Sequence, residues 1–206
     1  MKPYVVIDQY WQWVNIPVRP LQMIEGAGRT CYKSEHKITS ESAQKFVSMI
    51  LKRGHESVIE HMSASVLFVT NRGVTHELVR HRIAAYSQES TRYVNYKNRG
   101  MIFIKPVWWD KASEKSKDIW AKSAQQDVIN YEDLLYEGWR PEEARDVLPN
   151  CLKTEIVTTF NLRQWRHVFK QRCSKAAHPQ MRALMRDCLK GFQKYIPILF
   201  DDIEVD

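Results

Sequence analysis

The chain has 206 residues, of which 44% are hydrophobic and 27% are charged, as in an ordinary globular protein. This length suits one sizeable domain and is too short for two comfortable ones, so we expect a single domain over residues 1–206. No window approaches the roughly 20 apolar residues of a membrane span, and the N-terminus lacks the pattern of a signal peptide. We therefore expect a cytoplasmic protein with no membrane partner.

The net charge of +7 favours an anionic partner, either nucleic acid or a phosphorylated metabolite. Composition alone does not choose between these two classes.

The four cysteines, Cys31, Cys151, Cys173 and Cys188, form no C-x-x-C pair. Without an export signal we expect them to be reduced thiols that serve mainly in packing. Cys151 or Cys173 as a nucleophile is the alternative, but no local feature marks either one as a thiolate with a low pKa.

Hydrophobic periodicity predicts an α/β (α+β) fold with more helix than strand, in which helices flank a central sheet. The first half is predicted to contain a strand near residues 1–8, a helix over 40–52 that ends at Gly54, a strand over 64–70, a turn at 71–73 and a short helix from Thr75 to about Arg82. The second half is predicted to contain an edge strand over 101–109, a helix over 115–137, a helix from Pro141 that stops at Pro149, and helices over 162–172 and 180–194. We expect Pro197 to break the last helix and the acidic tail over 201–206 to fray.

Residues 80–93 form the most informative segment, because arginines, a histidine, hydroxyl groups and an amide are concentrated there. Arginine presents a planar fork of donors that fits phosphate and carboxylate oxygens. A ligand-binding loop, a nucleic-acid patch and a surface helix end all remain open from composition alone.

The same segment resembles the signature of the flavin-dependent thymidylate synthases, in which R-H-R is followed after seven residues by serine. The matching residues are Arg80, His81, Arg82 and Ser90, and Arg92 and Tyr93 fit the extension S-x-R-Y. Three further elements resemble the family in the same order: His55 to His61 (H-x-S/T-x-x-E-H), Ala144 to Pro149 (A-R-x-x-L-P), and Asn161-Leu162-Arg163 followed by His167 and Arg172. The resemblance extends from about Gly54 to Arg182.

This resemblance implies reductive methylation of dUMP to dTMP, with NADPH-reduced FAD as the hydride source and methylenetetrahydrofolate as the carbon donor. It also implies a homotetramer in which several subunits build each active site. Because the flavin supplies the hydride in this family, no cysteine nucleophile is required.

The site residues are carried over from the resemblance. FAD is expected to contact Ser57, Arg80, His81, Arg82, Gln88, Asn161, Arg163 and His167. The nucleotide dUMP is expected to contact Glu77, Arg80, Gln88, Ser90, Thr91, Arg92, Arg145 and Arg172. Arg172 and Ser90 are expected to be catalytic, by stabilising charge on the uracil ring and by polarising the pyrimidine. His55 and Tyr93 are candidates for the folate pocket.

Three positions depart from the commoner family pattern. His167 stands where asparagine is frequent in the family, and Glu77 stands where glutamine is frequent. His178-Pro179-Gln180-Met181 replaces a stretch that more often resembles Ala-Gln-x-Glu-Ile.

The competing interpretations are a basic nucleic-acid-binding module and a phosphate-ester hydrolase. The first predicts binding that weakens steeply with salt and no cofactor. The second needs a metal cluster or a nucleophile, and the histidines show no i,i+4 pair of the kind that binds zinc. We expect no metal and no nucleic-acid partner.

Overall fold

The computed structural model describes residues 4–204, apart from the side chain of Asn98. The chain divides into two compact units, and each is described by itself. The first unit comprises the described residues up to Trp11, together with Phe68–Arg80 and Ser87–Ile156; the second comprises Gln12–Leu67, His81–Tyr86 and the described residues from Val157 onward.

The described residues form one two-stranded and one four-stranded sheet. In the smaller sheet β1 (Tyr4–Ile7) pairs in parallel with β5 (Met101–Ile104). The larger sheet has the order β2 (Tyr10–Asn15), β3 (Ser63–Asn71), β6 (Lys153–Asn161) and β4 (Ala85–Gln88). Helices accompany both sheets, so the predicted mixed α/β class is confirmed.

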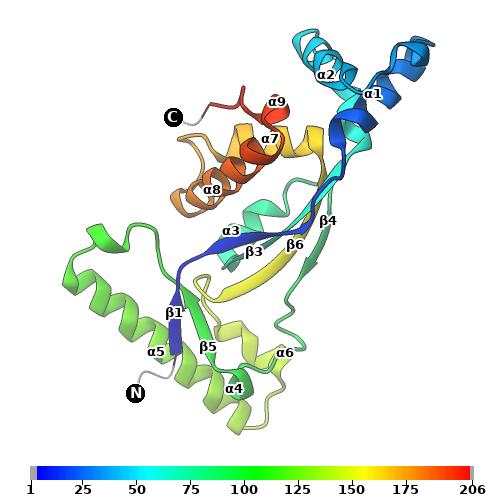
Figure 1. The fold of residues 1–206 in the computed structure, drawn as a ribbon. Coiled ribbons are helices and arrows are strands. Elements are labelled where there is room, and N and C mark those ends of the chain that lie inside the picture. The colour runs from blue at the N-terminus through cyan, green and yellow to red at the C-terminus, as the bar shows by residue number, and fades with distance from the viewer. Residues whose placement is uncertain (1–3, 205–206) are drawn as a thin grey trace. The chain divides into compact units, whose positions relative to one another are not determined.

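The core of the first unit lies between the β1–β5 pair and α5 (Glu114–Tyr136), which runs alongside both strands (Figure 1). Ala124, Val128 and Tyr131 form the buried stripe of α5, as the periodicity predicts. Shorter elements complete this unit: α3 (Arg72–Leu78), α4 (Tyr96–Arg99), the 3-10 turn Trp109–Lys111, α6 (Pro141–Ala144) and the 3-10 turn Arg145–Val147.

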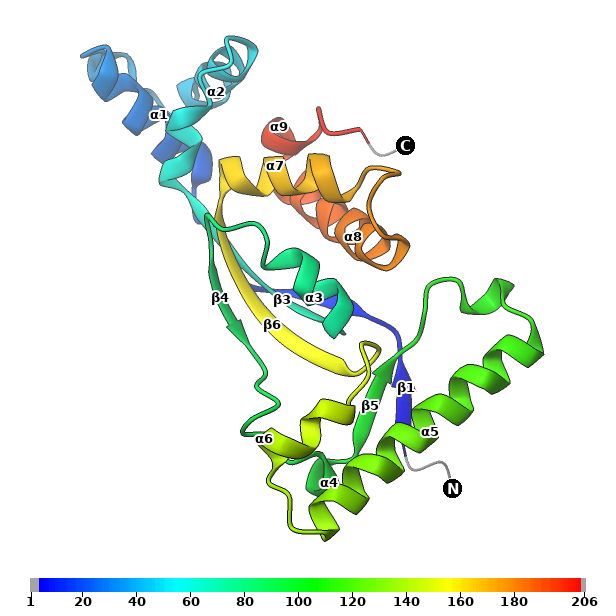
Figure 2. The same ribbon diagram turned by 180° about the vertical axis from the view of Figure 1, so that it is seen from behind.

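The second unit is mostly helical, with α7 (Leu162–Arg172), α8 (Pro179–Tyr195) and α9 (Pro197–Phe200) packed together (Figure 2). Trp165 stacks on Phe169 with 5.4 Å between ring centroids, and Phe192 lies within 5.1 Å of both rings. The N-terminal helices α1 (Pro20–Cys31) and α2 (Ser42–Lys52) also pack against each other, with the 3-10 turns Glu35–Lys37 and Glu56–His61 beside α1. These aromatic and aliphatic contacts fix the position of α7 within the unit.

Most long helices lie where the sequence predicts them. Helix α7 spans the predicted range 162–172, and α2, α5 and α8 agree with their predicted ranges to within a residue or two. The predicted strand near residues 1–8 corresponds to β1, and its first three residues lie outside the described part of the chain.

Four predicted details are wrong. Residues 71–73 form no turn, because β3 extends to Asn71, whose Oδ1 accepts a hydrogen bond from the amide of Val74 and so starts α3 at Arg72. The strand predicted over 101–109 ends at Ile104. The short helix predicted from Thr75 to about Arg82 ends at Leu78. Pro197 follows the end of α8, as predicted, and it also begins α9, because proline suits the first turn of a helix.

The fourth concerns the acidic tail, which does not fray within its described residues. Ile203 is buried, and Asp202 accepts two hydrogen bonds from Arg166.

Strand β6 and helix α1 are two of the elements that the sequence did not predict. Strand β6 alternates buried and half-buried residues, but two of its fully buried positions are Thr154 and Thr158, which hide its apolar face. Helix α1 contains Gly26 and Gly28, which weaken its helical pattern. Gly28 lies so close to the Phe46 ring that a Cβ there would lie 2.6 Å from the ring carbons, so a close contact accounts for this glycine.

Candidate active site

In the first unit, the segment after β4 gathers most of the predicted nucleotide residues. Ser90, Thr91 and Arg92 follow Gln88 after one intervening residue, and the chain turns there because the amides of Tyr93 and Val94 both donate to the Ser90 carbonyl. The Ser90 hydroxyl accepts a hydrogen bond from the Arg92 amide at 3.2 Å. We call residues 88–92, which include predicted nucleotide contacts, the substrate loop.

Arg145, which lies some fifty residues further along the chain, meets the substrate loop within the first unit. The 3-10 turn that follows α6 carries it, and its Nη1 donates to Thr91 Oγ1 at 3.4 Å. Arg92 forms a 3.5 Å ion pair with Glu142 of α6. Arg145 therefore contacts a buried threonine of the loop, and Arg92 contacts the short helix that precedes Arg145. Guanidinium groups are donors of the kind that an anionic ligand requires.

Gln88 has part of its hydrogen-bonding capacity committed inside the first unit. Its amide nitrogen donates to Thr75 at 2.9 Å and to Thr154 at 3.2 Å, and both threonines are fully buried. Its amide oxygen thus faces away from those threonines, and only this acceptor remains for a ligand.

In the second unit, Asn161 caps α7, Arg163 lies in its first turn and His167 near its middle, and all three line one cavity of about 440 Å³. The Oδ1 of Asn161 caps the helix by accepting from the Gln164 amide at 2.8 Å. The remaining wall of this cavity is formed by Glu56, Glu60, Ile83, Gln164, Arg166 and Lys170. We call this cavity the α7 cavity.

The arginines of the α7 cavity are paired with carboxylates. Arg163 Nη1 lies 2.5 Å from Glu60 Oε1, and its Nε lies 3.7 Å from Glu56. Arg166 is buried and pairs with Glu56 at 3.4 Å and with Asp202. An anionic ligand that reaches Arg163 must therefore exchange with Glu60.

His81 and Arg172 contact each other in the second unit, as the Nε of Arg172 donates to the Nε2 of His81 at 2.9 Å. Burial, with help from the charges of Arg172 and His167, lowers the pKa of His81 to about 4. The imidazole is therefore neutral at neutral pH, so its Nε2 can accept the hydrogen bond from Arg172. The Tyr86 hydroxyl donates to the His81 carbonyl at 2.8 Å, which holds the backbone of this residue.

The other predicted residues lie at or near the surface. Ser57, Arg80 and Arg82 are exposed, whereas Glu77 is half-buried near the end of α3. Of the folate candidates, His55 and Tyr93 are both exposed. These side chains are placed by the loops and helix ends that carry them, and the Arg92 guanidinium lies 5.5 Å from the centre of the Tyr93 ring.

Three residues with polar roles in these sites were missed from the sequence. Glu60 lies in the H-x-S-x-x-E-H element and Tyr86 in the arginine-rich segment, but the sequence pattern predicts no role for either side chain. Glu89, the single acid of that segment, forms ion-pair and hydrogen-bond contacts that only the folded chain reveals.

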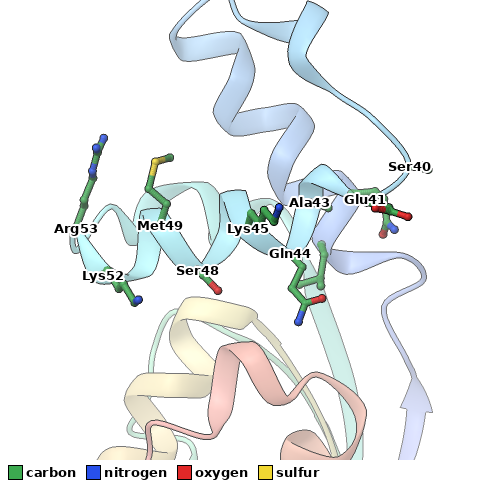
Figure 3. Close-up of a pocket in the computed structure, with 11 residues that line it drawn as sticks. Ser40, Glu41, Ala43, Gln44, Lys45, Ser48, Met49, Lys52 and Arg53 are labelled. Carbon is green, nitrogen blue, oxygen red and sulfur yellow. The ribbon is translucent and has the colours of Figure 1, made fainter.

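A second, larger cavity of about 1000 Å³ lies beside α1 and α2, and the side chains of Gln44, Lys45, Ser48, Lys52 and Arg53 line it (Figure 3). None of the predicted site residues belongs to it. Size therefore does not identify the site, and the chemistry of the lining residues does.

The cysteines show no sign of activation. Burial raises the pKa of both Cys151 and Cys173 to about 11, so both are protonated at neutral pH. All four cysteines, which lie within residues 4–204, are free thiols. The described residues also contain no cluster of potential metal ligands and no helix long and apolar enough to cross a membrane.

Comparison with known proteins decides the family. The family model described as thymidylate synthase complementing protein matches residues 14–198. A flavin-dependent thymidylate synthase of Geobacter sulfurreducens is 35% identical over 183 residues, which cover 85% of this chain and 78% of the relative. The enzyme of the same name from Mycobacterium tuberculosis is 35% identical over 202 residues, with 89% and 79% covered. The chain belongs to the flavin-dependent thymidylate synthase family.

Solved structures confirm that the fold is that of the flavin-dependent thymidylate synthases. Thymidylate synthase X from Helicobacter pylori, solved with FAD and dUMP, superposes with a TM-score of 0.75 at 22% identity, over 95% of this chain and 98% of the other. The UMP/dUMP methylase PolB from Streptomyces cacaoi, bound with 5-Br dUMP, gives a TM-score of 0.81 at 18% identity, over 96% and 95%.

Proposed function

We propose that this chain is a flavin-dependent thymidylate synthase that converts dUMP to dTMP with FAD, NADPH and methylenetetrahydrofolate. The observation that carries the proposal is the identity of about 35% over most of the chain with enzymes of that name. The clustering of the motif residues in each unit supports it. Family membership favours this function over a nucleic-acid-binding module or a hydrolase.

The α7 cavity fits a phosphate-bearing part of FAD. Arg163, Arg166 and Lys170 supply cationic donors to its lining, and their charge is balanced by Glu56, Glu60 and the Asp202 partner of Arg166. Its volume of about 440 Å³ lies in the range of small-molecule sites. Asn161, Arg163 and His167 would hold the cofactor there, with Ser57, Arg80, His81, Arg82 and Gln88 as the further contacts that we propose. FAD supplies the hydride, which no side chain can provide.

The substrate loop is the proposed nucleotide site. Arg92 and Arg145 supply the forked donors that suit a phosphate, and the Ser90 and Thr91 hydroxyls and the Gln88 oxygen supply further polar contacts. Glu77 and Arg80 are the remaining nucleotide contacts in this proposal. The Ser90 hydroxyl polarises the pyrimidine by hydrogen bonding, without forming a covalent bond to it.

Arg172 is the proposed electrostatic catalyst. Its Nε donates to neutral His81, and this hydrogen bond orients a guanidinium that would stabilise negative charge developing on the uracil ring. This assignment leaves no step to a cysteine, in keeping with the protonated state of Cys151 and Cys173.

We propose five wider properties on the strength of the family resemblance. The chain acts as one functional domain over residues 1–206, since β3 and β6 each have residues in both units. It assembles as a homotetramer with shared active sites. It uses NADPH in the cytoplasm, and it binds no nucleic acid.

The test is a visible absorption spectrum of the purified protein after incubation with FAD and desalting. We expect a retained oxidised-flavin spectrum that bleaches with NADPH and shifts when dUMP is added. A colourless protein that does not retain FAD would reject the flavoenzyme function.

Two substitutions test the catalytic assignments. Ser90→Ala and Arg172→Ala are expected to retain FAD and to lose at least 100-fold in dTMP formation, because each removes a contact to the reacting ring. Arg99→Ala, which changes an exposed arginine of α4, is the control and should remain close to the wild type. Wild-type turnover in Ser90→Ala or Arg172→Ala would show that the assigned role is wrong.

A further inference from the structure

Glu89 occupies an unexpected position for an acid, because it lies between Gln88 and Ser90 in a loop that is rich in ligands for an anion. A carboxylate that faced the phosphate side would oppose the binding of dUMP. The structure shows that the Glu89 side chain instead forms an ion pair with Lys153 inside the first unit.

Every polar group of Glu89 has a partner there. Its Oε1 accepts a 3.0 Å hydrogen bond from the Tyr96 hydroxyl, and its Oε2 lies 3.1 Å from Lys153 Nζ. Its backbone amide donates to the Glu155 carbonyl at 2.9 Å, and its own carbonyl accepts from Arg72 at 3.5 Å. Four contacts to three different elements, α4, β6 and α3, thus meet at one residue of the loop.

The partners of Glu89 are themselves firmly placed. Tyr96 is 5% exposed and its ring lies 6.0 Å from that of Tyr131 on α5. The Lys153 and Glu89 side chains are only 15% and 17% exposed, so water screens their attraction weakly. Burial, with the charge of Glu89, raises the pKa of Tyr96, which therefore remains a hydrogen-bond donor at any physiological pH.

Lys153 also remains a charged partner. Burial lowers the pKa of Lys153, but the hydrogen bonds to Glu155 and Glu89 outweigh burial, so the pKa lies above its ordinary value. Glu155 is its second partner, at 2.5 Å, with a side chain that is 45% exposed.

We propose that Glu89 is a positioning residue that anchors the substrate loop to Tyr96 and Lys153 and so holds Ser90, Thr91 and Arg92 in their dUMP-binding positions. The proposal rests on the proposed function of that loop. Glu89 itself does not touch the nucleotide: its carboxylate neutralises Lys153 on the inner side of the loop, while the arginines serve the phosphate.

The loop has a second attachment through Arg145 and Thr91. Loss of the Glu89 anchor should therefore loosen the loop without detaching it. The affinity for dUMP should fall, because a loop that samples several positions must be ordered when dUMP binds.

The experiment compares Glu89→Gln with Glu155→Gln in the full chain loaded with FAD. Both variants remove one carboxylate from Lys153, but only Glu89 belongs to the substrate loop, so Glu155→Gln is the matched control. For each variant we would measure FAD retention, the KM for dUMP and kcat for dTMP formation. We expect Glu89→Gln to raise the KM for dUMP at least tenfold with FAD retained and kcat changed by less than threefold, and Glu155→Gln to remain within twofold of the wild type.

The outcomes separate this inference from the function itself. A wild type that holds FAD but does not respond to dUMP would reject the proposed function of the loop. A wild type that responds, with an unchanged KM in Glu89→Gln, would overturn the role of Glu89 alone. An equal rise in KM in both variants would also overturn it, because the effect would then come from Lys153.

Tyr96→Phe provides a second measurement if Glu89→Gln does not fold. This variant keeps the buried ring and removes only the hydroxyl that donates to Glu89. We expect the KM for dUMP to rise about threefold with FAD retained, and an unchanged KM in a folded Tyr96→Phe variant would overturn the inference.

Discussion

Asp202→Asn should destabilise the second unit, because Asp202 holds a buried guanidinium. The Asp202 carboxylate accepts two hydrogen bonds of 2.6 Å from Arg166, which is only 4% exposed. The other contacts of that guanidinium are the Leu199 carbonyl and Glu56 at 3.4 Å. The asparagine amide can keep one of the two hydrogen bonds but supplies no negative charge.

The magnitude follows from the unequal burial of the two partners. Breaking a fully buried ion pair costs about 3–5 kcal/mol. The Asp202 side chain is 55% exposed, so water can replace part of its interaction with Arg166 in the variant. We therefore expect a loss of about 1–2 kcal/mol, which for a chain of this size lowers Tm by about 3–6 °C. Because α7 carries Arg166 together with Asn161 and Arg163, FAD affinity should fall as well.

The effect should depend on pH in a defined direction. The hydrogen bond from Arg166 lowers the pKa of Asp202 in the folded state. The ion pair between Asp202 and Arg166 therefore contributes fully to stability above the pKa of about 4 that Asp202 has in the unfolded chain. This contribution is lost as the pH falls through the lower pKa that Asp202 has in the folded protein. The difference in Tm between wild type and Asp202→Asn should be full at pH 7 and should shrink below about pH 4.

Thermal unfolding followed by circular dichroism at several pH values measures this difference. Asp201→Asn is the matched control, because Asp201 is the adjacent exposed carboxylate and should leave Tm within about 1 °C of the wild type. Equal Tm values for Asp202→Asn and Asp201→Asn at pH 7 would refute the reasoning. A difference that persists unchanged at low pH would refute the electrostatic part of it.

Two further predictions concern packing and thiols. Gly28→Ala should lower the free energy of unfolding, measured with denaturant, by about 1–2 kcal/mol. The new Cβ would lie 2.6 Å from the Phe46 ring, and this overpacking outweighs the gain in helix propensity. Gly26→Ala in the same helix is the control, because its Cβ meets nothing within 4 Å, and this variant should be neutral or stabilising. A stable Gly28→Ala variant would mean that the ring moves aside. Cys151→Ser and Cys173→Ser should both keep dTMP formation, because thiols with a pKa of about 11 supply no nucleophile at neutral pH; loss of activity with intact folding would reopen that role.

The helices with a continuous apolar stripe could be predicted from the sequence with good accuracy. Helices α5 and α7 have regular stripes, and proline or asparagine marks the start of α6, α8 and α7. Such signals are local, because each depends on residues within one or two turns of the chain. Strand β6 and helix α1 were missed for the converse reason: buried threonines and glycines remove the apolar pattern while their packing partners lie far away in the sequence.

The candidate site followed from the order of short motifs, which the amino-acid sequence determines by itself. The sequence fixes which residue types are available to bind an anion, such as Arg92, Arg145 and Arg163. It also determines the family, because about 35% identity over most of the chain requires no knowledge of the fold. Motif spacing says nothing, however, about which of these side chains already have partners.

Only the tertiary structure decided those partnerships. Long-range contacts set them: Glu60 with Arg163 across 103 residues, Arg172 with His81 across 91, and Lys153 with Glu89 across 64. The same contacts determine that His81 is neutral and that the Glu89 carboxylate faces Tyr96 and Lys153. The physical reason is that charge and hydrogen bonding depend on distance in space and on burial, and both are set when the folded chain brings distant residues together.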